Sequence, residues 1–123
     1  MRASRYARQE KEYRKKMIAE FTAARGARLM DRTRPRWFLR VHRVRLNIES
    51  NVDCILGQEY GDYCRGRVAL DIGPFRAACY GFAPLAPNPR GWDKLNVAWQ
   101  AEIAARLTTR ALDAVDQEPL VLV

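Results

Sequence analysis

The residues best suited to chemistry gather in one stretch, residues 51–66, which holds two of the three cysteines. Its acid–base candidates are Asp53, Glu59, Asp62, Tyr60 and Tyr63. Asp53 and Asp62 are nine residues apart, which is about 2.5 turns of a helix, so they would lie on opposite sides. The chain contains no P-loop, GxSxG or HExxH motif. We therefore predict that the protein is not an enzyme and that the two tyrosines are core residues.

The cysteines lack the spacing of a metal site. Cys54, Cys64 and Cys79 form no CxxC pair, and His42 is the only histidine. Structural zinc sites usually draw their four ligands from closely spaced pairs of Cys and His. We expect three reduced thiols, with no metal and no cofactor.

Positive charge is concentrated at the start of the chain. The net charge is +8, and residues 1–45 hold 15 Lys/Arg against 4 Asp/Glu, whereas residues 46–123 hold 7 against 10. Cations can neutralise phosphates, and arginine can also stack on bases. The candidate binding residues are Arg5, Arg8, Lys11, Arg14, Lys15, Lys16, Arg34, Arg36, Arg40, Arg43 and Arg45. Tyr6, Tyr13, Trp37 and His42 are interleaved with them.

This basic region predicts nucleic-acid binding. Nothing in the chain resembles a helix-turn-helix, zinc-finger or RRM signature, so we expect little sequence specificity. Other readings stay open. The cations could simply keep the protein soluble, or the basic helix could bind an acidic surface on a partner protein. A second copy of the chain is a further candidate partner, and a membrane surface is disfavoured because the helix has few large aliphatic residues.

Residues 1–30 are predicted to form one long basic amphipathic helix. Its apolar stripe would be Tyr6, Tyr13, Met17, Phe21 and Ala24. We expect the helix to end before Pro35. A short helix over 36–42 and an extended segment over 43–48 should follow.

A central helix over residues 52–70 is predicted next, with Ser50 or Asn51 as its N-cap. Small residues recur along it at steps of three and four and would form one packing stripe: Cys54, Gly57, Gly61, Cys64 and Val68. Leu56 and Tyr63 lie on another side. Because two glycines in a helix are costly, the stripe indicates close approach by a neighbouring helix, so Gly57→Leu or Gly61→Leu should unfold the domain.

The remaining elements complete an all-α fold. A short helical turn over 75–80 should end at Gly81, and Asp93 should cap a last helix over 93–112, followed by a tail over 113–123. We predict a single domain over 1–123, built as a compact bundle of about three main helices, with the core over 36–112. No apolar run approaches the roughly 18 residues that cross a bilayer, and no signal-peptide pattern is present, so we expect a cytoplasmic protein.

The run from Asp53 to Tyr63, Asp-Cys-Ile-Leu-Gly-Gln-Glu-Tyr-Gly-Asp-Tyr, resembles the signature of a set of small actinobacterial and actinophage proteins. The similarity extends over about residues 26–103, through Trp37, Tyr80-Gly-Phe82 and Trp99. That family has no established activity. The resemblance implies a phage or accessory-gene origin, for which binding to a host or phage protein would be typical. Family members often carry a second cysteine before the motif, where this chain has Asn51, and the basic N-terminal helix is outside the pattern.

Overall fold

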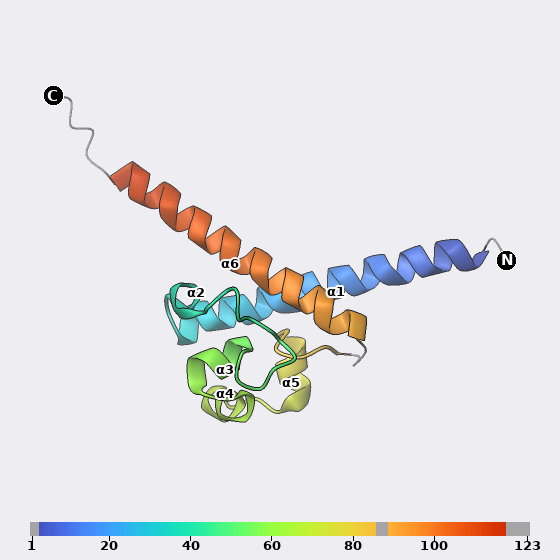
Figure 1. Ribbon diagram of the computed structural model, residues 1–123, viewed down its shortest axis with the longest axis horizontal. Coiled ribbons are helices and arrows are strands. Elements are labelled where there is room, and N and C mark those ends of the chain that lie inside the picture. The colour runs from blue at the N-terminus through green and yellow to red at the C-terminus, as the bar shows by residue number, and fades with distance from the viewer. Residues whose placement is uncertain (1–2, 86–88, 118–123) are drawn as a thin grey trace.

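The computed structural model describes residues 3–85 and 89–117, and every regular element within them is a helix (Figure 1). These are α1 (Ala3–Thr33), α2 (Trp37–Arg40), α3 (Ile55–Tyr60), α4 (Tyr63–Leu70), α5 (Pro74–Cys79) and α6 (Pro89–Gln117). The predicted all-α fold is confirmed.

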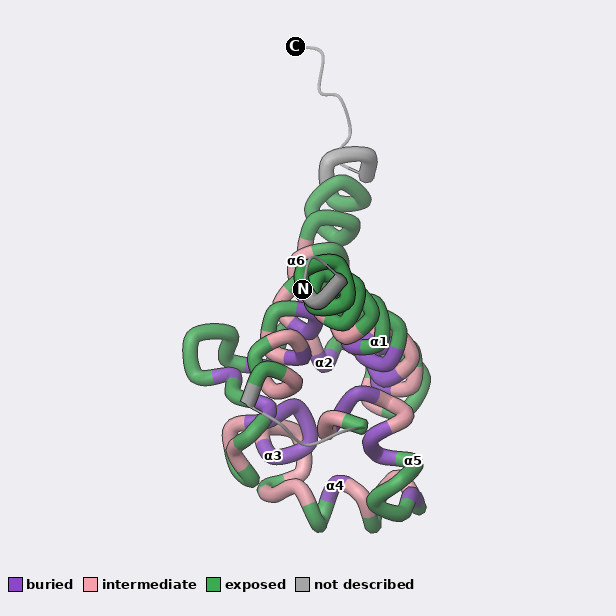
Figure 2. The backbone as a smooth tube through the Cα atoms, turned by 90° about the vertical axis from the view of Figure 1, so that its right-hand side faces the viewer, coloured by how far each residue is buried: buried purple, intermediate pink, exposed green. Residues whose placement is uncertain are grey.

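The two long helices, α1 and α6, cross as an X, and α3, α4 and α5 lie together on one side of the crossing (Figure 1). Both helices run in the same direction. Near its start, α6 pairs with Glu12 of α1 through Lys94, and further along it pairs with Asp31 through Arg106. Beyond the crossing, the first turns of α1 and the last turns of α6 are exposed (Figure 2).

Small side chains allow α1 and α6 to pack closely. The buried face of α1 consists of Ala19, Thr22, Ala23, Gly26, Ala27 and Met30. Trp99 of α6 is fully buried against this face, and its Nε1 donates a hydrogen bond to the Gly81 carbonyl at 2.7 Å. A large ring on one helix therefore matches a shallow face on the other.

The prediction that α1 packs through its tyrosine-containing stripe is wrong. Tyr6, Tyr13, Met17 and Phe21 are 72%, 64%, 50% and 63% exposed. Both faces of this helix have helical spacing, so periodicity alone could not choose between them. The packing partner decides which face of α1 is buried, because the large indole of Trp99 fits against the face of small side chains.

Three aromatic residues form the centre of the core. Trp37 and Trp99 meet edge to face with ring centroids 5.6 Å apart, and Phe82 stacks on Trp99 at 5.5 Å. These geometries suit aromatic pairs, which stabilise a core beyond the area they bury. Met30 and Ile103 are also fully buried, so α1, α2 and α6 share one hydrophobic core with the loop that carries Phe82.

The predicted central helix over 52–70 is two short helices, α3 and α4. Gly61 has a φ of 103°, which ends α3, and the Asp62 carboxylate then accepts a hydrogen bond from the Arg65 backbone at 2.7 Å to cap α4. The small-residue stripe is consequently broken. Cys54 and Gly57 are buried in α3 and its cap, whereas Gly61, Cys64 and Val68 are exposed.

Other boundaries differ less. The segment over 43–48 forms turns instead of an extended strand-like run. The last helix begins at Pro89 and continues to Gln117, so Asp93 lies inside it and the first residues of the predicted tail are helical. The short helices expected near 36–42 and 75–80 correspond to α2 and α5, and Gly81 has a φ of 71°. The end of the tail, 118–123, lies outside the described residues.

Candidate functional site

The first half of α1 forms a basic arm, which we define as residues 5–18. It holds six Lys/Arg and two Glu. All of its side chains are exposed except those of Glu12 and Lys15, which are half-buried. Its basic residues are Arg5, Arg8, Lys11, Arg14, Lys15 and Lys16. The arm thus presents cations to solvent around most of its circumference.

Glu12 fixes the arm to α6. Its carboxylate accepts hydrogen bonds from Lys94 Nζ at 2.9 Å and from Arg90 Nη1 at 3.1 Å. Hydrogen bonds from Lys94 and then Arg90 lower the pKa of Glu12. The carboxylate is therefore neutralised by α6, which also brings two further cations beside the arm.

The other cations of the arm are weakly engaged. Arg14 lies 3.8 Å from Glu10, and Lys16 lies 4.0 Å from Glu20, both as exposed pairs within the helix. Such pairs contribute little to stability and are easily exchanged for another anion. Among the described residues, no ion pair joins Arg5, Arg8 or Lys11 to an acidic group.

The second predicted cluster is partly used within the fold. Glu59 is 3% exposed at its side chain, and Arg40 binds its two oxygens at 2.7 and 3.1 Å. Arg34 lies 3.7 Å from the same carboxylate and donates to the Glu59 carbonyl at 3.1 Å. Both arginines hold the end of α3 against the junction of α1 and α2, and this role limits their availability to a ligand.

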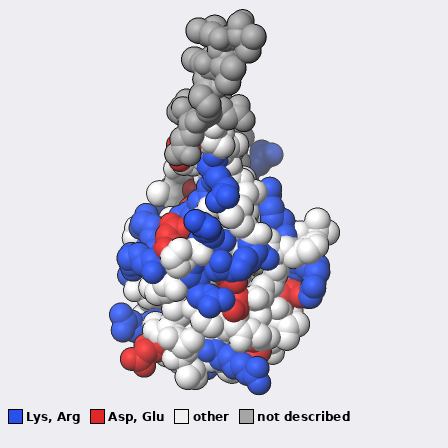
Figure 3. Space-filling view, turned by 90° about the vertical axis from the view of Figure 1, so that its left-hand side faces the viewer, with Lys and Arg blue, Asp and Glu red and all other residues white. Residues whose placement is uncertain are grey.

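Further along the second cluster, Arg45 pairs with Asp53 at 2.9 Å, and Arg43 donates to Gln100 Oε1 at 3.1 Å. Arg36 is exposed and has no ion pair among the described residues. Figure 3 faces the end of the molecule where α1 terminates, and Lys and Arg gather there with Asp and Glu between them. Positive and negative side chains are therefore mixed on this face, whereas the arm is mainly positive.

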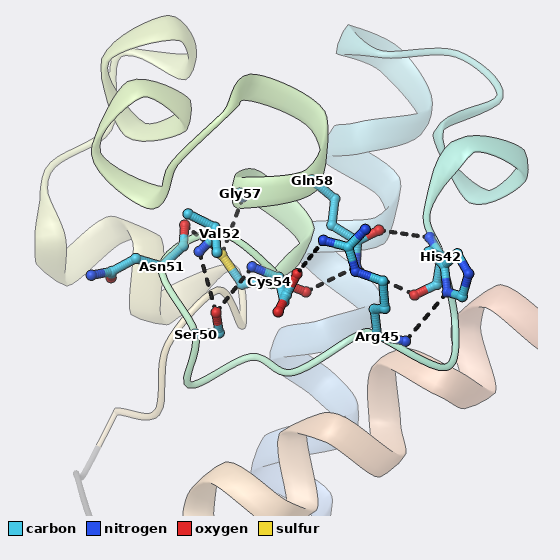
Figure 4. Close-up of polar contacts among 9 residues, drawn as sticks. His42, Arg45, Ser50, Asn51, Val52, Cys54, Gly57 and Gln58 are labelled. Atoms are coloured by element: carbon cyan, nitrogen blue, oxygen red, sulfur yellow. Dashed lines mark hydrogen bonds and ion pairs between the residues drawn. The ribbon is translucent and has the colours of Figure 1, made fainter.

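Gln58 has a structural role in the fold, and it is a residue that the sequence reasoning did not single out. Its Oε1 accepts from the His42 backbone at 2.6 Å, and its Nε2 donates to the carbonyls of Asp53 at 2.9 Å and His42 at 3.3 Å (Figure 4). One amide therefore fastens both ends of the irregular segment before α3.

Cys54 is the N-cap of α3. Its sulfur accepts a hydrogen bond from the Gly57 backbone at 3.2 Å, and its thiol donates to the Asn51 carbonyl at 3.8 Å (Figure 4). Burial raises the pKa of this thiol, so it is protonated at neutral pH and unsuited to nucleophilic attack. All three cysteines are free, and the described residues contain no cluster of three His, Cys, Asp or Glu that could hold a metal ion.

The acid–base candidates have structural contacts. Asp53 pairs with Arg45, and Asp62 caps α4. The ring of Tyr60 lies under the Arg34 guanidinium at 5.0 Å, and that of Tyr63 lies under Arg67 at 5.3 Å. Each of these side chains therefore has a partner within the fold.

A polar cluster that the sequence reasoning only partly anticipated joins α1 to α6. Arg106 donates to both oxygens of Asp31, at 2.9 and 2.8 Å, and to Glu102 at 2.7 Å. Trp37 Nε1 also donates to Asp31, at 2.9 Å. The i,i+4 spacing of Glu102 and Arg106 was visible in the sequence, whereas the contact with Asp31 depends on how the helices cross.

Compared with models of protein families, with curated proteins and with solved structures, the chain matches none of them. In the part of the chain that the structure describes, no helix combines the length and apolarity needed to cross a membrane.

Proposed function

We propose that this protein binds nucleic acid without strong sequence specificity and that the arm is its binding element. One observation carries the proposal: the arm extends past the crossing with α6, is exposed on most sides, and holds six cations against two glutamates. A chain of this size could pair these cations with its own acidic side chains. Instead, Arg5, Arg8 and Lys11 have no acidic partner among the described residues.

The arm has a suitable length for the phosphate backbone. Its 14 residues span about 20 Å at 1.5 Å per residue. Each cation that neutralises a phosphate releases a counterion, and this release provides affinity that is independent of base sequence. Arg90 and Lys94 at the base of the arm extend the positive surface, because among the described residues they pair with no carboxylate other than that of Glu12.

The two basic clusters are not equivalent candidates. Arg34, Arg40 and Arg45 are in ion pairs that secure the fold. Arg36 and Arg43 are exposed and could add contacts at the other end of the molecule. We therefore place the main binding residues in the arm. The resemblance to phage-type proteins also favours a small accessory binding protein, and a host or phage protein with an acidic surface is the alternative ligand for the same cations.

The test is a binding titration with a random-sequence oligonucleotide over a series of salt concentrations. We expect affinity to fall steeply with salt, with a logarithmic slope of about −5 if six phosphates are neutralised. Reversing Arg5, Arg8 and Lys11 together to Glu should abolish binding without unfolding the protein, because these side chains make no ion pair within the part of the chain that the structure describes.

A matched control reverses three exposed arginines away from the arm, Arg28, Arg76 and Arg110, and changes the net charge equally. This variant should retain most of the affinity. Equal loss in both variants would show that only net charge matters, and a wild-type protein that binds no oligonucleotide at low salt would refute the function.

A further inference from the structure

The exposed aromatic residues of α1 share one face. Tyr6, Tyr13 and Phe21 are 72%, 64% and 63% exposed. They are seven and eight residues apart, about 1.9 and 2.2 helical turns, so the three residues lie within an arc of about 80° at intervals of about 10–12 Å. This face is distinct from the small-residue face that packs on Trp99, so the fold leaves it uncovered.

The aromatic face ends in an apolar hollow. A groove of about 370 Å³ lies where α1 meets α5 and the following loop, and it is lined by Met17, Ile18, Phe21, Arg25, Cys79 and Leu85. The polar residues of its lining are Thr22, which is buried, and Arg25. The Arg25 guanidinium lies over the rings of Tyr80 at 5.2 Å and Phe21 at 5.9 Å. A flat ring entering the groove would therefore meet apolar side chains and a cation.

We propose that this face binds single-stranded nucleic acid in preference to duplex; this inference rests on the function proposed above. Bases in a duplex are stacked and paired, so their flat faces are hidden from exposed protein rings. In a single strand they can stack on aromatic side chains while the backbone follows nearby cations. At about 100° per residue, Arg14 and Lys16 lie about 100° and 60° from Tyr13 on opposite sides of it, so cations flank the aromatic face and could contact the phosphates beside the stacked bases.

Charge argues against a second copy of the chain on this face. Two arms pressed together would bring six cations and two glutamates of one copy against the same set in the other, and like charges in close apposition are costly. Nucleic acid is a polyanion whose bases are flat rings, so it can pair with the cations and stack on the exposed aromatic side chains.

The experiment compares a labelled thymidine oligomer with a duplex of the same length and label, using fluorescence anisotropy at matched salt. The wild-type protein should bind the single strand at least about tenfold more tightly, since each stacked base stabilises the complex substantially. The variant Tyr6→Ala/Tyr13→Ala/Phe21→Ala should lose that preference and keep its salt slope, because no cation is changed.

Two controls separate stacking from general damage. Phe75→Ala removes an equally exposed aromatic ring (75%) on α5, away from the arm, and should leave both affinities unchanged. Tyr6→Phe/Tyr13→Phe keeps the rings and should retain the preference. Circular dichroism on each variant checks that the fold is intact.

Equal affinity of the wild-type protein for single strand and duplex would overturn this inference and leave the proposed function standing. So would an unchanged preference in the triple alanine variant. Binding to neither nucleic acid would overturn both proposals. If an acidic amphipathic peptide then bound with saturation, the aromatic face would be a protein-docking surface.

Discussion

Gly26 lies directly against the indole of Trp99. A Cβ built on Gly26 would come within 2.8 Å of the Trp99 ring and would also collide with the carbonyl oxygen of Tyr80. The same contact sets the separation of α1 and α6 and positions the loop after α5. Gly26 of α1 is therefore the glycine that allows the two long helices to approach closely.

Replacing Gly26 with Ala should push the two long helices apart. Overpacking a core costs about 1–3 kcal/mol, and the greater helix propensity of alanine offsets about 1 kcal/mol of this. We expect the free energy of unfolding, measured by urea denaturation, to fall by about 1–2 kcal/mol, the upper part of the net range, because the added Cβ also meets a backbone carbonyl. Gly73→Ala is the control, because nothing lies within 4 Å of its added Cβ. A Gly26→Ala variant as stable as Gly73→Ala would contradict the packing of Trp99 described here.

Substitutions of Gly57 and of Gly61 should destabilise the protein for different reasons. A Cβ on Gly57 would come within 2.5 Å of the Asn51 carbonyl oxygen and of the Val52 backbone, whereas one on Gly61 would make only ordinary van der Waals contact with the Arg65 side chain, whose Nη1 is nearest at 3.4 Å. Gly61 has a φ of 103°, which an L-residue adopts only at a cost of about 1–2 kcal/mol.

We therefore expect Gly57→Leu to unfold the domain, as the sequence predicts, and Gly61→Leu to remain folded with a lower melting temperature. Thermal melts followed by circular dichroism would measure this difference. A Gly57→Leu variant with the wild-type melting temperature would show that the loop over residues 51–54 can move away, against the arrangement seen here.

Arg40 should matter more for stability than its neighbour Arg36. Among the described residues, Arg40→Met would leave the Glu59 carboxylate, 3% exposed, with only the more distant Arg34 as a charged partner. An uncompensated buried charge is costly, although Arg40 itself is 45% exposed at its side chain, so a loss of about 1–2 kcal/mol is expected. Arg36→Met is the matched control and should change stability little, because Arg36 is exposed without an ion pair in the described residues. Similar urea midpoints for the two variants would show that Glu59 does not depend on Arg40.

The helices could be predicted from local pattern, but their faces could not. Tyr13 and Met17 match helical spacing as well as Ala23 and Ala27 do, and only the distant Trp99 decides which side is buried. The division of the central helix had a local signal that was missed. Asp62 after Gly61 is a good N-cap, and reading Gly61 as a packing residue hid the break.

The candidate site was predictable in a similar, partial way. The arm was identified from charge alone, since its cations exceed the acidic residues near them in sequence. Charge alone could not distinguish the second cluster from the arm. Arg40 is nineteen residues from Glu59, and Arg43 is fifty-seven residues from Gln100, so whether these arginines are free depends on tertiary structure. Gln58 was overlooked because a single amide carries no periodic or charge signal.

Stability should fall in acid partly through Asp31. Hydrogen bonding from Arg106 lowers the pKa of this carboxyl, against a smaller opposing effect of burial, and Trp37 adds to the lowering. A carboxyl whose pKa is depressed in the folded state stabilises the protein above its unfolded pKa, near 3.8, and loses that contribution as pH falls through the folded value. The wild-type free energy of unfolding should therefore decrease below about pH 4.

Asp31→Asn isolates this contribution. Asparagine can still accept from Trp37 through its amide oxygen, but it cannot pair with Arg106 as a charge. At neutral pH the variant should be less stable than the wild-type protein. The difference should begin to shrink below about pH 4 and vanish once the pH is below the lowered pKa of Asp31 in the folded state, where the wild-type carboxyl is neutral. Urea denaturation at a series of pH values measures both curves. Parallel curves through the acid range would mean that Asp31 has the same pKa in the folded and unfolded states, and the pairing with Arg106 would then be too weak to hold α1 and α6 together at this end.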